Sequence, residues 1–385
     1  MSDIMICNYE TLLDDRVLEE LLNKNLECIL TDESQYFRSK DAERSKALYK
    51  LNKAKVKIGA TATPITKDPR DIYGLFKFIN PDLLGSYNNF SKKYIKWAGF
   101  GKINGFKNMD QLRDLIANDI IIKTKEEISG QLPSLNVIKK YIDMDTKILE
   151  MHNRLMEELD KLNDMDFNIR SKCKSELEVM NNEELAKIEA KIMALQTFAQ
   201  EIADSPLLLE MSDSEMAKEY CIKTKSNAKL ELCLELISEI IDSGEKVCIF
   251  SKFERMQKIL TDAILKNYKD IKIAYVNGSL NSTQRYEEAY TKFRDNDDYK
   301  VLLMSDSGAE GINLSRCKYL IEYELSSSYA IQTQKHGRLE RADSVHNSVT
   351  VYQLIARDTW DQIQEKIIDK KEAFDIDIIK SIAKK

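Results

Sequence analysis

The sequence predicts an α/β protein with two parallel-sheet lobes, the first of them incomplete, joined by a helical region. Short apolar, β-branched runs alternate with helix-length segments in the first and last thirds of the chain, which is typical of a mostly parallel sheet covered on both faces. Residues 131–243 contain no glycine, and their apolar residues recur at three and four positions, which indicates amphipathic helices. The 385 residues can hold two or three domains at roughly 150 residues each.

These patterns divide the chain into four segments. Residues 1–142 are expected to form the first lobe, 143–225 the helical region, 226–356 the second lobe and 357–385 a helical tail. The strands expected in the first lobe are residues 3–9, 26–32 and 56–61, and those in the second lobe are 246–250, 272–276, 300–304, 319–323 and 349–355.

Composition excludes several classes of protein. The net charge is −6, from 58 Lys+Arg and 64 Asp+Glu, and 43% of the residues are hydrophobic, so the chain is not globally disordered. No apolar run reaches the ~18 residues of a membrane span, and the first residues lack the pattern of a secretory signal. Seven cysteines without a C-x-x-C pair favour reduced thiols in a cytoplasmic protein and argue against a structural zinc site. The short length weakly favours a bacterial or viral source.

The carboxyl ends of the predicted strands are the first place to look for a site, because ligands collect there in parallel sheets. Asp32 and Glu33 end the second expected strand. Such a pair can divide two tasks, in which Asp32 holds Mg²⁺ through water and Glu33 orients or deprotonates the attacking water. Taken alone, the pair is more typical of charges at the start of a helix.

Two further features of the first lobe are compatible with a functional role and also with a purely structural one. Thr61 and Thr63 form a hydroxyl-rich turn after the third strand, which suits a hydrogen-bond relay as well as a helix cap. Aromatic residues then interleave with lysines, which suits contact with a phosphate backbone but, at helical spacing, is more typical of core packing. The aromatic residues are Tyr87, Phe90, Tyr94 and Trp97, and the lysines are Lys92, Lys93 and Lys96.

In the second lobe, small residues follow the strand at 300–304. The run includes Gly308, Gly311 and Asn313, and glycines there let backbone amides approach phosphates. Farther along, Gln334, Arg338 and Arg341 have the i, i+4, i+7 spacing of one helix face. Two such arginines can neutralise charge on a transferred phosphoryl group, although alone they are more typical of an ordinary surface.

These features occur in one order along nearly the whole chain, and in that order they resemble the motifs of Swi/Snf-type DNA translocases of helicase superfamily two. The matching segments are NYETL, TDESQ, GATATPI, DIYGLFKFINPDLLGSYNNF, IIIKTKEEISGQLP, ADSPLLL, KLELCLELI, KVCIFSKF, VNGSLNSTQR, SDSGAEGINL and QKHGRLERA. The resemblance covers residues 3–365, and the long block after GATATPI is its most family-specific part.

The resemblance implies two RecA-like lobes that hydrolyse ATP with Mg²⁺ at the cleft between them and thereby move along double-stranded DNA. It makes Asp32 and Glu33 the magnesium and water-activating pair, with Gln334, Arg338 and Arg341 completing the ATP site from the second lobe. The remaining implied roles are coupling for Thr61 and Thr63, DNA-backbone contact for Asn277, Gly278, Ser279 and Arg285, and contact with nucleotide and DNA for Gly308, Gly311 and Asn313.

The chain also departs from this family. It contains no P-loop of the form G-x-x-x-x-G-K-[ST], since Gly101-Lys102 is followed by Ile103. Without the segment that carries the P-loop, we expect the first sheet to have an uncovered edge and a partly open core. Gln35 stands where the family often has His, and Asp306 and Glu310 lie in a loop that is usually more basic or neutral.

Three hypotheses therefore stay open. The chain is the carboxyl-terminal part of a translocase whose P-loop segment is encoded on a separate chain, lost, or omitted from the sequence. Alternatively, it is a non-catalytic DNA-binding or partner-binding module derived from such a translocase. A third hypothesis treats the helical middle as a coiled-coil interaction arm, although its apolar spacing drifts away from strict heptads.

Overall fold

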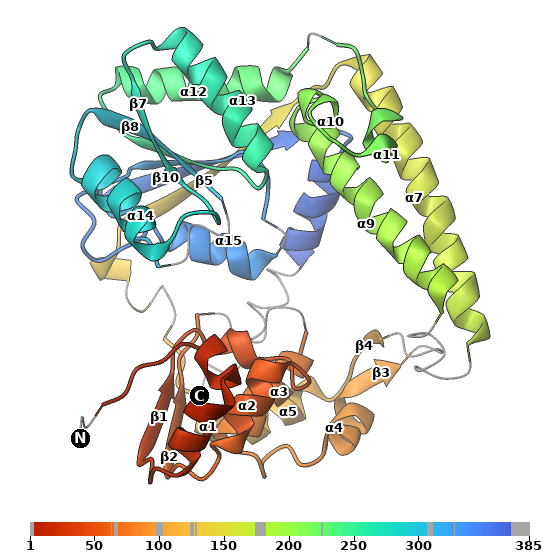
Figure 1. Cartoon of the computed structure of the whole chain (residues 1–385), viewed down its shortest axis with the longest axis vertical. Coiled ribbons are helices and arrows are strands. Elements are labelled where there is room, and N and C mark those ends of the chain that lie inside the picture. Colours follow the sequence, from red (N-terminus) through yellow and green to blue (C-terminus); the bar gives the residue numbers. More distant parts are fainter. Residues whose placement is uncertain are drawn as a thin grey trace. The chain divides into compact units, whose positions relative to one another are not determined.

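The computed structural model divides the chain into two compact units, one within residues 1–123 and the other within residues 124–371 (Figure 1). The residues that it describes are 4–62, 64, 68–97, 103–123, 127, 129–173, 182–224, 226–305, 311–326 and 328–370. Thr63, Gly308 and the Gly101-Lys102 pair, which the sequence analysis singled out, lie outside these residues.

The first unit is built on a parallel pair of strands packed against helices. Strand β1 (Cys28–Thr31) pairs with β2 (Val56–Gly59), in register from Cys28↔Val56 to Thr31↔Gly59. A second, antiparallel pair consists of β3 (Ile95–Trp97) and β4 (Ile103–Phe106). The helices are η1 (Glu10–Leu13), α1 (Asp15–Leu22), η2 (Ser34–Phe37), α2 (Glu43–Lys50), α3 (Arg70–Ile79), α4 (Tyr87–Tyr94), α5 (Met109–Ile116) and η3 (Ala117–Asp119).

Helix α3 fixes the packing of this unit through one glycine. A Cβ atom on Gly74 would lie 1.8 Å from the backbone oxygen of Arg38, so any other residue would push the helix away from that backbone. The Gly74 carbonyl also accepts a hydrogen bond from the Tyr49 hydroxyl at 2.9 Å. The close approach lets Phe78 of α3 pack edge-on against Phe37, with their ring centroids 5.6 Å apart.

One face of the β1–β2 sheet is bare. Leu30, Val56 and Ile58 are 67%, 49% and 47% exposed, and Cys28 on the same face is also exposed. Among the described residues, neither strand pairs with a third one. Within the described part of the first lobe, the sheet therefore has an unpaired edge and an exposed apolar face.

The prediction of a strand at residues 3–9 is wrong for the described part of that segment. Ile4 and Ile6 are 78% and 95% exposed, and residues 4–8 form no strand. The alternating apolar pattern can form a strand only beside a partner strand, and the described residues supply none.

The second unit contains a six-stranded, all-parallel sheet with the order β5-β10-β9-β6-β8-β7. Five of its strands confirm the predicted runs: β6 (Val247–Phe250), β7 (Lys272–Val276), β8 (Tyr299–Met304), β9 (Tyr319–Glu322) and β10 (Ser348–Ala356). The sixth, β5 (Ser134–Ile142), pairs with β10 along its whole length. Residues 134–142 therefore belong to the second sheet, although the sequence analysis assigned them to the first lobe.

Helices cover both faces of this sheet, as the apolar runs require. Alternate residues of β6 face opposite sides, with Val247 and Ile249 in one buried core and Cys248 and Phe250 in the other. The helices around the sheet are α12 (Ala228–Asp242), α13 (Glu254–Asn267), α14 (Ser282–Tyr286), the π-helix η5 (Glu287–Arg294), α15 (Tyr329–His336) and helical residues 360–370.

The predicted helical middle is confirmed as an arm of long helices. Helices α7 (Thr146–Lys172) and α9 (Glu183–Asp204) lie side by side (Figure 1), and their apolar residues form one buried core that includes Leu155, Leu195 and Ile202. The short elements of the unit are η4 (Ser129–Gln131), α10 (Leu207–Glu210) and α11 (Glu215–Lys218).

Candidate functional site

The carboxyl end of β1 carries the acidic pair on an unusual backbone. Glu33 has φ +47°, a left-handed conformation that is uncommon outside glycine and is enriched at functional sites. The Glu33 amide donates to Oδ1 of Asp32 at 2.9 Å, and the Tyr9 hydroxyl donates to the Asp32 carbonyl oxygen at 2.6 Å. Burial raises the pKa of Tyr9 to about 12, so this hydroxyl keeps its proton and holds the turn in place.

Gln35 joins the acidic pair to the turn after β2. Its amide nitrogen donates to Oε2 of Glu33 at 2.7 Å, and its amide oxygen accepts from the Thr61 hydroxyl at 2.6 Å. Gln35 is buried, so its two hydrogen bonds fix both partners. The structure therefore brings Asp32, Glu33 and Thr61 together, and the glutamine that departs from the family pattern is their link.

The described residues contain no group of three or more His, Cys, Asp or Glu side chains that could hold a metal ion. Asp32 and Glu33 alone offer two carboxylates. Mg²⁺ in nucleotide sites usually takes one or two carboxylates, several waters and the phosphates of the substrate. The pair fits a magnesium ion that arrives with a nucleotide, and it does not fit a resident metal centre.

The aromatic residues of α4 belong to the core. Tyr87, Phe90 and Tyr94 pack with Tyr73 in one apolar cluster, as helical spacing favoured. Trp97 is 44% exposed, and its indole N–H donates to Ser91. Lys92, Lys93 and Lys96 are all exposed, so these lysines are accessible to an anionic partner.

In the second unit, the loop after β7 is held largely by its own hydrogen bonds. Oδ1 of Asn277 accepts from the amide and the hydroxyl of Ser279 at 3.1 and 2.6 Å. The Arg285 guanidinium donates to the carbonyls of Leu280 and Gly278 at 2.9 and 3.4 Å. Two of its five N–H donors thus brace the loop, and such a braced loop can present backbone groups to a phosphate.

The two arginines do not lie on a helix face with Gln334, and this geometric prediction is wrong. Helix α15 contains Gln334 but ends at His336, with Gly337 as its cap. Leu339 is buried in the core, and the Arg338 carbonyl accepts the Leu314 amide at 3.0 Å, so the chain turns away after α15. Nε of Arg341 is buried and has no hydrogen-bond partner among the described residues.

The Leu314 amide comes from the loop that follows β8. Gly311 in this loop has φ +76°, a conformation that favours glycine. Asn313 donates from its amide nitrogen to Asp343 at 2.9 Å. The structure therefore brings Gly311 and Asn313 next to the segment that contains Arg338 and Arg341.

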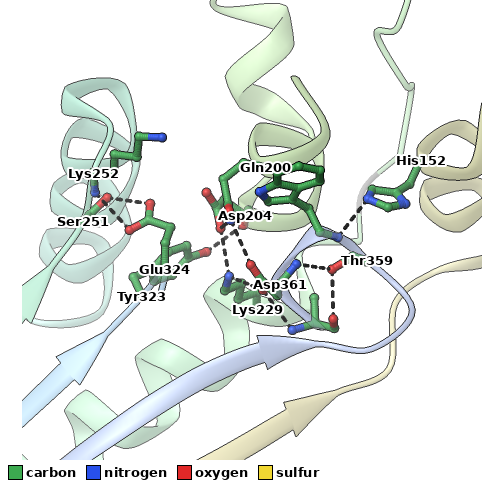
Figure 2. Close-up of polar contacts among 12 residues, drawn as sticks. His152, Gln200, Asp204, Lys229, Ser251, Lys252, Tyr323, Glu324, Thr359 and Asp361 are labelled. Carbon is green, nitrogen blue, oxygen red and sulfur yellow. Dashed lines mark hydrogen bonds and ion pairs between the residues drawn. The ribbon is translucent and has the colours of Figure 1, made fainter. Parts of the chain in front are cut away.

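A buried polar cluster, which the sequence analysis missed, lies at the carboxyl edge of the second sheet (Figure 2). Nζ of Lys229 donates to Asp204 at 2.8 Å and to Asp361 at 2.6 Å, and all three side chains are fully buried. Gln200 donates to both carboxylates at 3.0 and 2.8 Å. Burial raises the pKa of Asp204 well above its usual range although Lys229 lowers it.

Neighbouring groups extend this cluster to further elements. Glu324, which follows β9, accepts from the Ser251 hydroxyl and the Lys252 amide at 2.9 and 3.0 Å. His152 of α7 accepts the Trp360 amide at 2.9 Å, and burial lowers the pKa of this histidine to about 4. The cluster ties the helical arm, the sheet edge and helical residues 360–370 to one another. Lys229 and Asp361 are 132 residues apart, and no sequence pattern would pair them.

Comparison with known proteins gives the family. The pattern of the SNF2-related domain matches residues 1–208, and that of the helicase conserved C-terminal domain matches residues 228–343. The chain therefore belongs to the SNF2-related family, as a Swi/Snf-type member of helicase superfamily two. Among the described residues, no helix is long and apolar enough to cross a membrane.

Several relatives show the same similarity over nearly all of the chain. YwqA of Bacillus subtilis, named as an ATP-dependent helicase/translocase, is 24% identical over 99% of this chain and 38% of its own length. The ATP-dependent helicase fft2 of Schizosaccharomyces pombe is 23% identical over 98% of this chain and 33% of its own length. The chain spans about a third of the length of these relatives.

A solved structure is also similar. It is the Sulfolobus solfataricus SWI2/SNF2 ATPase core in complex with double-stranded DNA, with 23% identity and a TM-score of 0.45, and the match covers 97% of this chain and 72% of that one.

Proposed function

We propose that this chain is part of an ATP-dependent double-stranded-DNA translocase, a DNA-stimulated ATPase that moves along duplex DNA. The observation that carries the proposal is the Glu33–Gln35–Thr61 chain of hydrogen bonds. It connects a carboxylate suited to water activation with the turn after the next strand, so a change at the ATP phosphates reaches a second loop. Family membership and the helicase names of the relatives support the same function.

Each lobe contributes its own residues to this function. Asp32 holds Mg²⁺ through water, and Glu33 orients the attacking water. Arg338 and Arg341 neutralise charge on the transferred phosphoryl group, and Gln334, Gly308, Gly311 and Asn313 contact the nucleotide or the loop beside it. DNA is contacted through three exposed lysines and one loop, while Thr61 and Thr63 couple the ATP site to DNA. The residues that contact DNA are Lys92, Lys93, Lys96, Asn277, Gly278, Ser279 and Arg285.

The proposal includes a P-loop segment that docks on the bare face and free edge of the β1–β2 sheet. Parallel sheets are normally covered on both faces, because each strand has apolar residues on both sides. Leu30, Val56 and Ile58 offer an apolar surface of that kind, and no G-x-x-x-x-G-K-[ST] motif occurs in the 385 residues. We propose that a polypeptide segment with a G-x-x-x-x-G-K-[ST] loop, whether part of a longer form of this chain or encoded separately, supplies a further strand and helix.

Docking is tested by measuring the affinity of such a polypeptide for the purified chain. Ile58→Lys places a charge on the bare face and is expected to weaken binding at least about tenfold. Ile121→Lys is the matched control, because Ile121 is 94% exposed and belongs to neither strand. Equal affinities for the two variants would contradict docking on this face.

Translocation is tested with the assembled pair on duplex DNA that carries a third strand. We expect ATP-dependent release of the third strand without separation of the duplex. If the pair instead binds DNA in a salt-dependent way that ignores nucleotide and shows no turnover, the chain is a non-catalytic DNA-binding module.

A further inference from the structure

The loop between Gly311 and Ser315 is bound to the segment that carries both arginines. Oδ2 of Asp343 accepts from the side-chain amide of Asn313 at 2.9 Å and from the hydroxyl of Ser315 at 3.1 Å. The Leu314 amide donates to the Arg338 carbonyl at 3.0 Å. The side chains of Asn313 and Ser315 thus both bond to Asp343, and Leu314 between them bonds to the backbone of Arg338.

Both polar atoms of the Asn313 side chain take part in this arrangement. Its oxygen accepts the Ser315 amide at 2.8 Å, while its nitrogen donates to Asp343. The same hydrogen bond from Asn313 lowers the pKa of Asp343 below its ordinary value, so the carboxylate stays ionised near neutral pH. Asn313 therefore shapes the loop through both ends of its side-chain amide.

The opposite side of the loop is held by the π-helix η5. The Tyr290 hydroxyl accepts the Asn313 amide at 3.0 Å and donates to the Gly311 carbonyl at 3.4 Å. The ring of Tyr290 lies 4.7 Å from that of Tyr286 and 4.6 Å from the Arg294 guanidinium. The loop is thus held by Tyr290 on one side and by Asp343 on the other.

From these contacts we propose that Asp343 is a positioning residue, which clamps the Gly311–Ser315 loop to the Arg338–Arg341 segment so that the two move together. Asp343 itself is exposed, and its carboxylate acts through Asn313 and Ser315. The role of Arg338 in this inference rests on the proposed function, whereas the clamp itself does not. A displacement of the loop by DNA or nucleotide would reach Arg338 directly through the Leu314 amide.

Amide hydrogen exchange of the whole chain, without nucleotide or DNA, tests the clamp. Asp343→Leu removes the acceptor, and we expect the Leu314 and Val345 amides, which bond to Arg338 and Ser315, to exchange about tenfold faster. Asp343→Asn keeps one acceptor oxygen for both donors and should stay within about twofold of the parent chain. Asp298→Leu is the control, because Asp298 is an exposed carboxylate that pairs only with Lys272 among the described residues.

Unchanged exchange in Asp343→Leu would overturn the clamp, as would equally fast exchange in Asp343→Leu and Asp343→Asn. The functional effect is measured as ATP turnover of the chain together with a P-loop polypeptide and DNA. Asp343→Leu is expected to lower kcat about tenfold with DNA affinity unchanged, and Asp343→Asn to restore it. If the parent pair has no turnover, the proposed function fails, while the exchange rates still decide whether the clamp exists.

Discussion

Replacing Lys229 by methionine should destabilise the second unit strongly. The change removes the cation that contacts both Asp204 and Asp361 while all three side chains have no exposed surface. Burial already raises the pKa of one of these carboxyls, that of Asp204. Without the cation, the other carboxyl, that of Asp361, has to take up a proton or remain charged in a dry site, and either outcome costs free energy.

The magnitude follows from the reference pKa of aspartic acid. Protonating a carboxyl of pKa ~3.9 at pH 7 costs about 4 kcal/mol, at about 1.4 kcal/mol per unit. This agrees with the roughly 3–5 kcal/mol measured when one partner of a buried ion pair is removed. The same reasoning gives a pH signature, because protonation at pH 5 costs only about 1.5 kcal/mol, so the loss of stability should shrink as the pH falls.

Urea unfolding followed by Trp360 fluorescence measures this loss. The chain has two tryptophans, so a Trp97→Phe background leaves only Trp360, which lies beside Asp361 and packs against the arm. Lys191→Met is the matched control, because its ion pair with Glu158 is 40% and 31% exposed and should contribute less than about 1 kcal/mol. The reasoning is refuted if Lys229→Met costs no more than the control at pH 7, or if its cost does not depend on pH.

Three further predictions use other parts of the molecule. Arg338→Ala should lower ATP turnover by on the order of 10³ with DNA affinity unchanged, in steady-state assays of the assembled pair, and a loss below tenfold would remove this arginine from the ATP site. Charge reversal at Lys92, Lys93 and Lys96 should weaken DNA binding and flatten its salt dependence in titrations between low and moderate salt. Burial lowers the pKa of His152 to about 4 in the folded chain, whereas its pKa in the unfolded chain is ~6.5. As the pH falls, the unfolded chain therefore binds a proton at His152 before the folded chain does. The free energy of unfolding should therefore fall by up to about 3 kcal/mol from pH 7 to pH 4. If urea unfolding gives the same free energy over this pH range, His152 is not the buried neutral group described above.

The parts of the fold that sequence could predict are those with dense apolar runs. Strands β6, β8 and β9 are largely buried, and β7 and β10 also contain runs of apolar residues, so all five stand out from the helices between them. Strand β5 escaped prediction because it is an edge strand whose side chains are largely exposed, as at Val137 and Ile138. Its polar and apolar residues therefore follow no buried pattern.

The candidate site was predictable where neighbouring residues act together. Asp32 and Glu33 were found as a pair at a strand end, and the structure brings Thr61 to them through Gln35. The link through Gln35 could not be predicted, because it depends on how the ends of β1 and β2 face each other. Asp343 gave no signal either, since its partner Asn313 lies 30 residues earlier in the chain.

ATP hydrolysis by this chain together with a polypeptide that carries a P-loop, in the presence and absence of duplex DNA, tests the proposed function most directly. We expect turnover that duplex DNA stimulates and that the double substitution Asp32→Ala, Glu33→Ala abolishes, while the substituted chain still binds the polypeptide. Turnover that survives the double substitution, or no turnover from a folded pair bound to DNA, would contradict it.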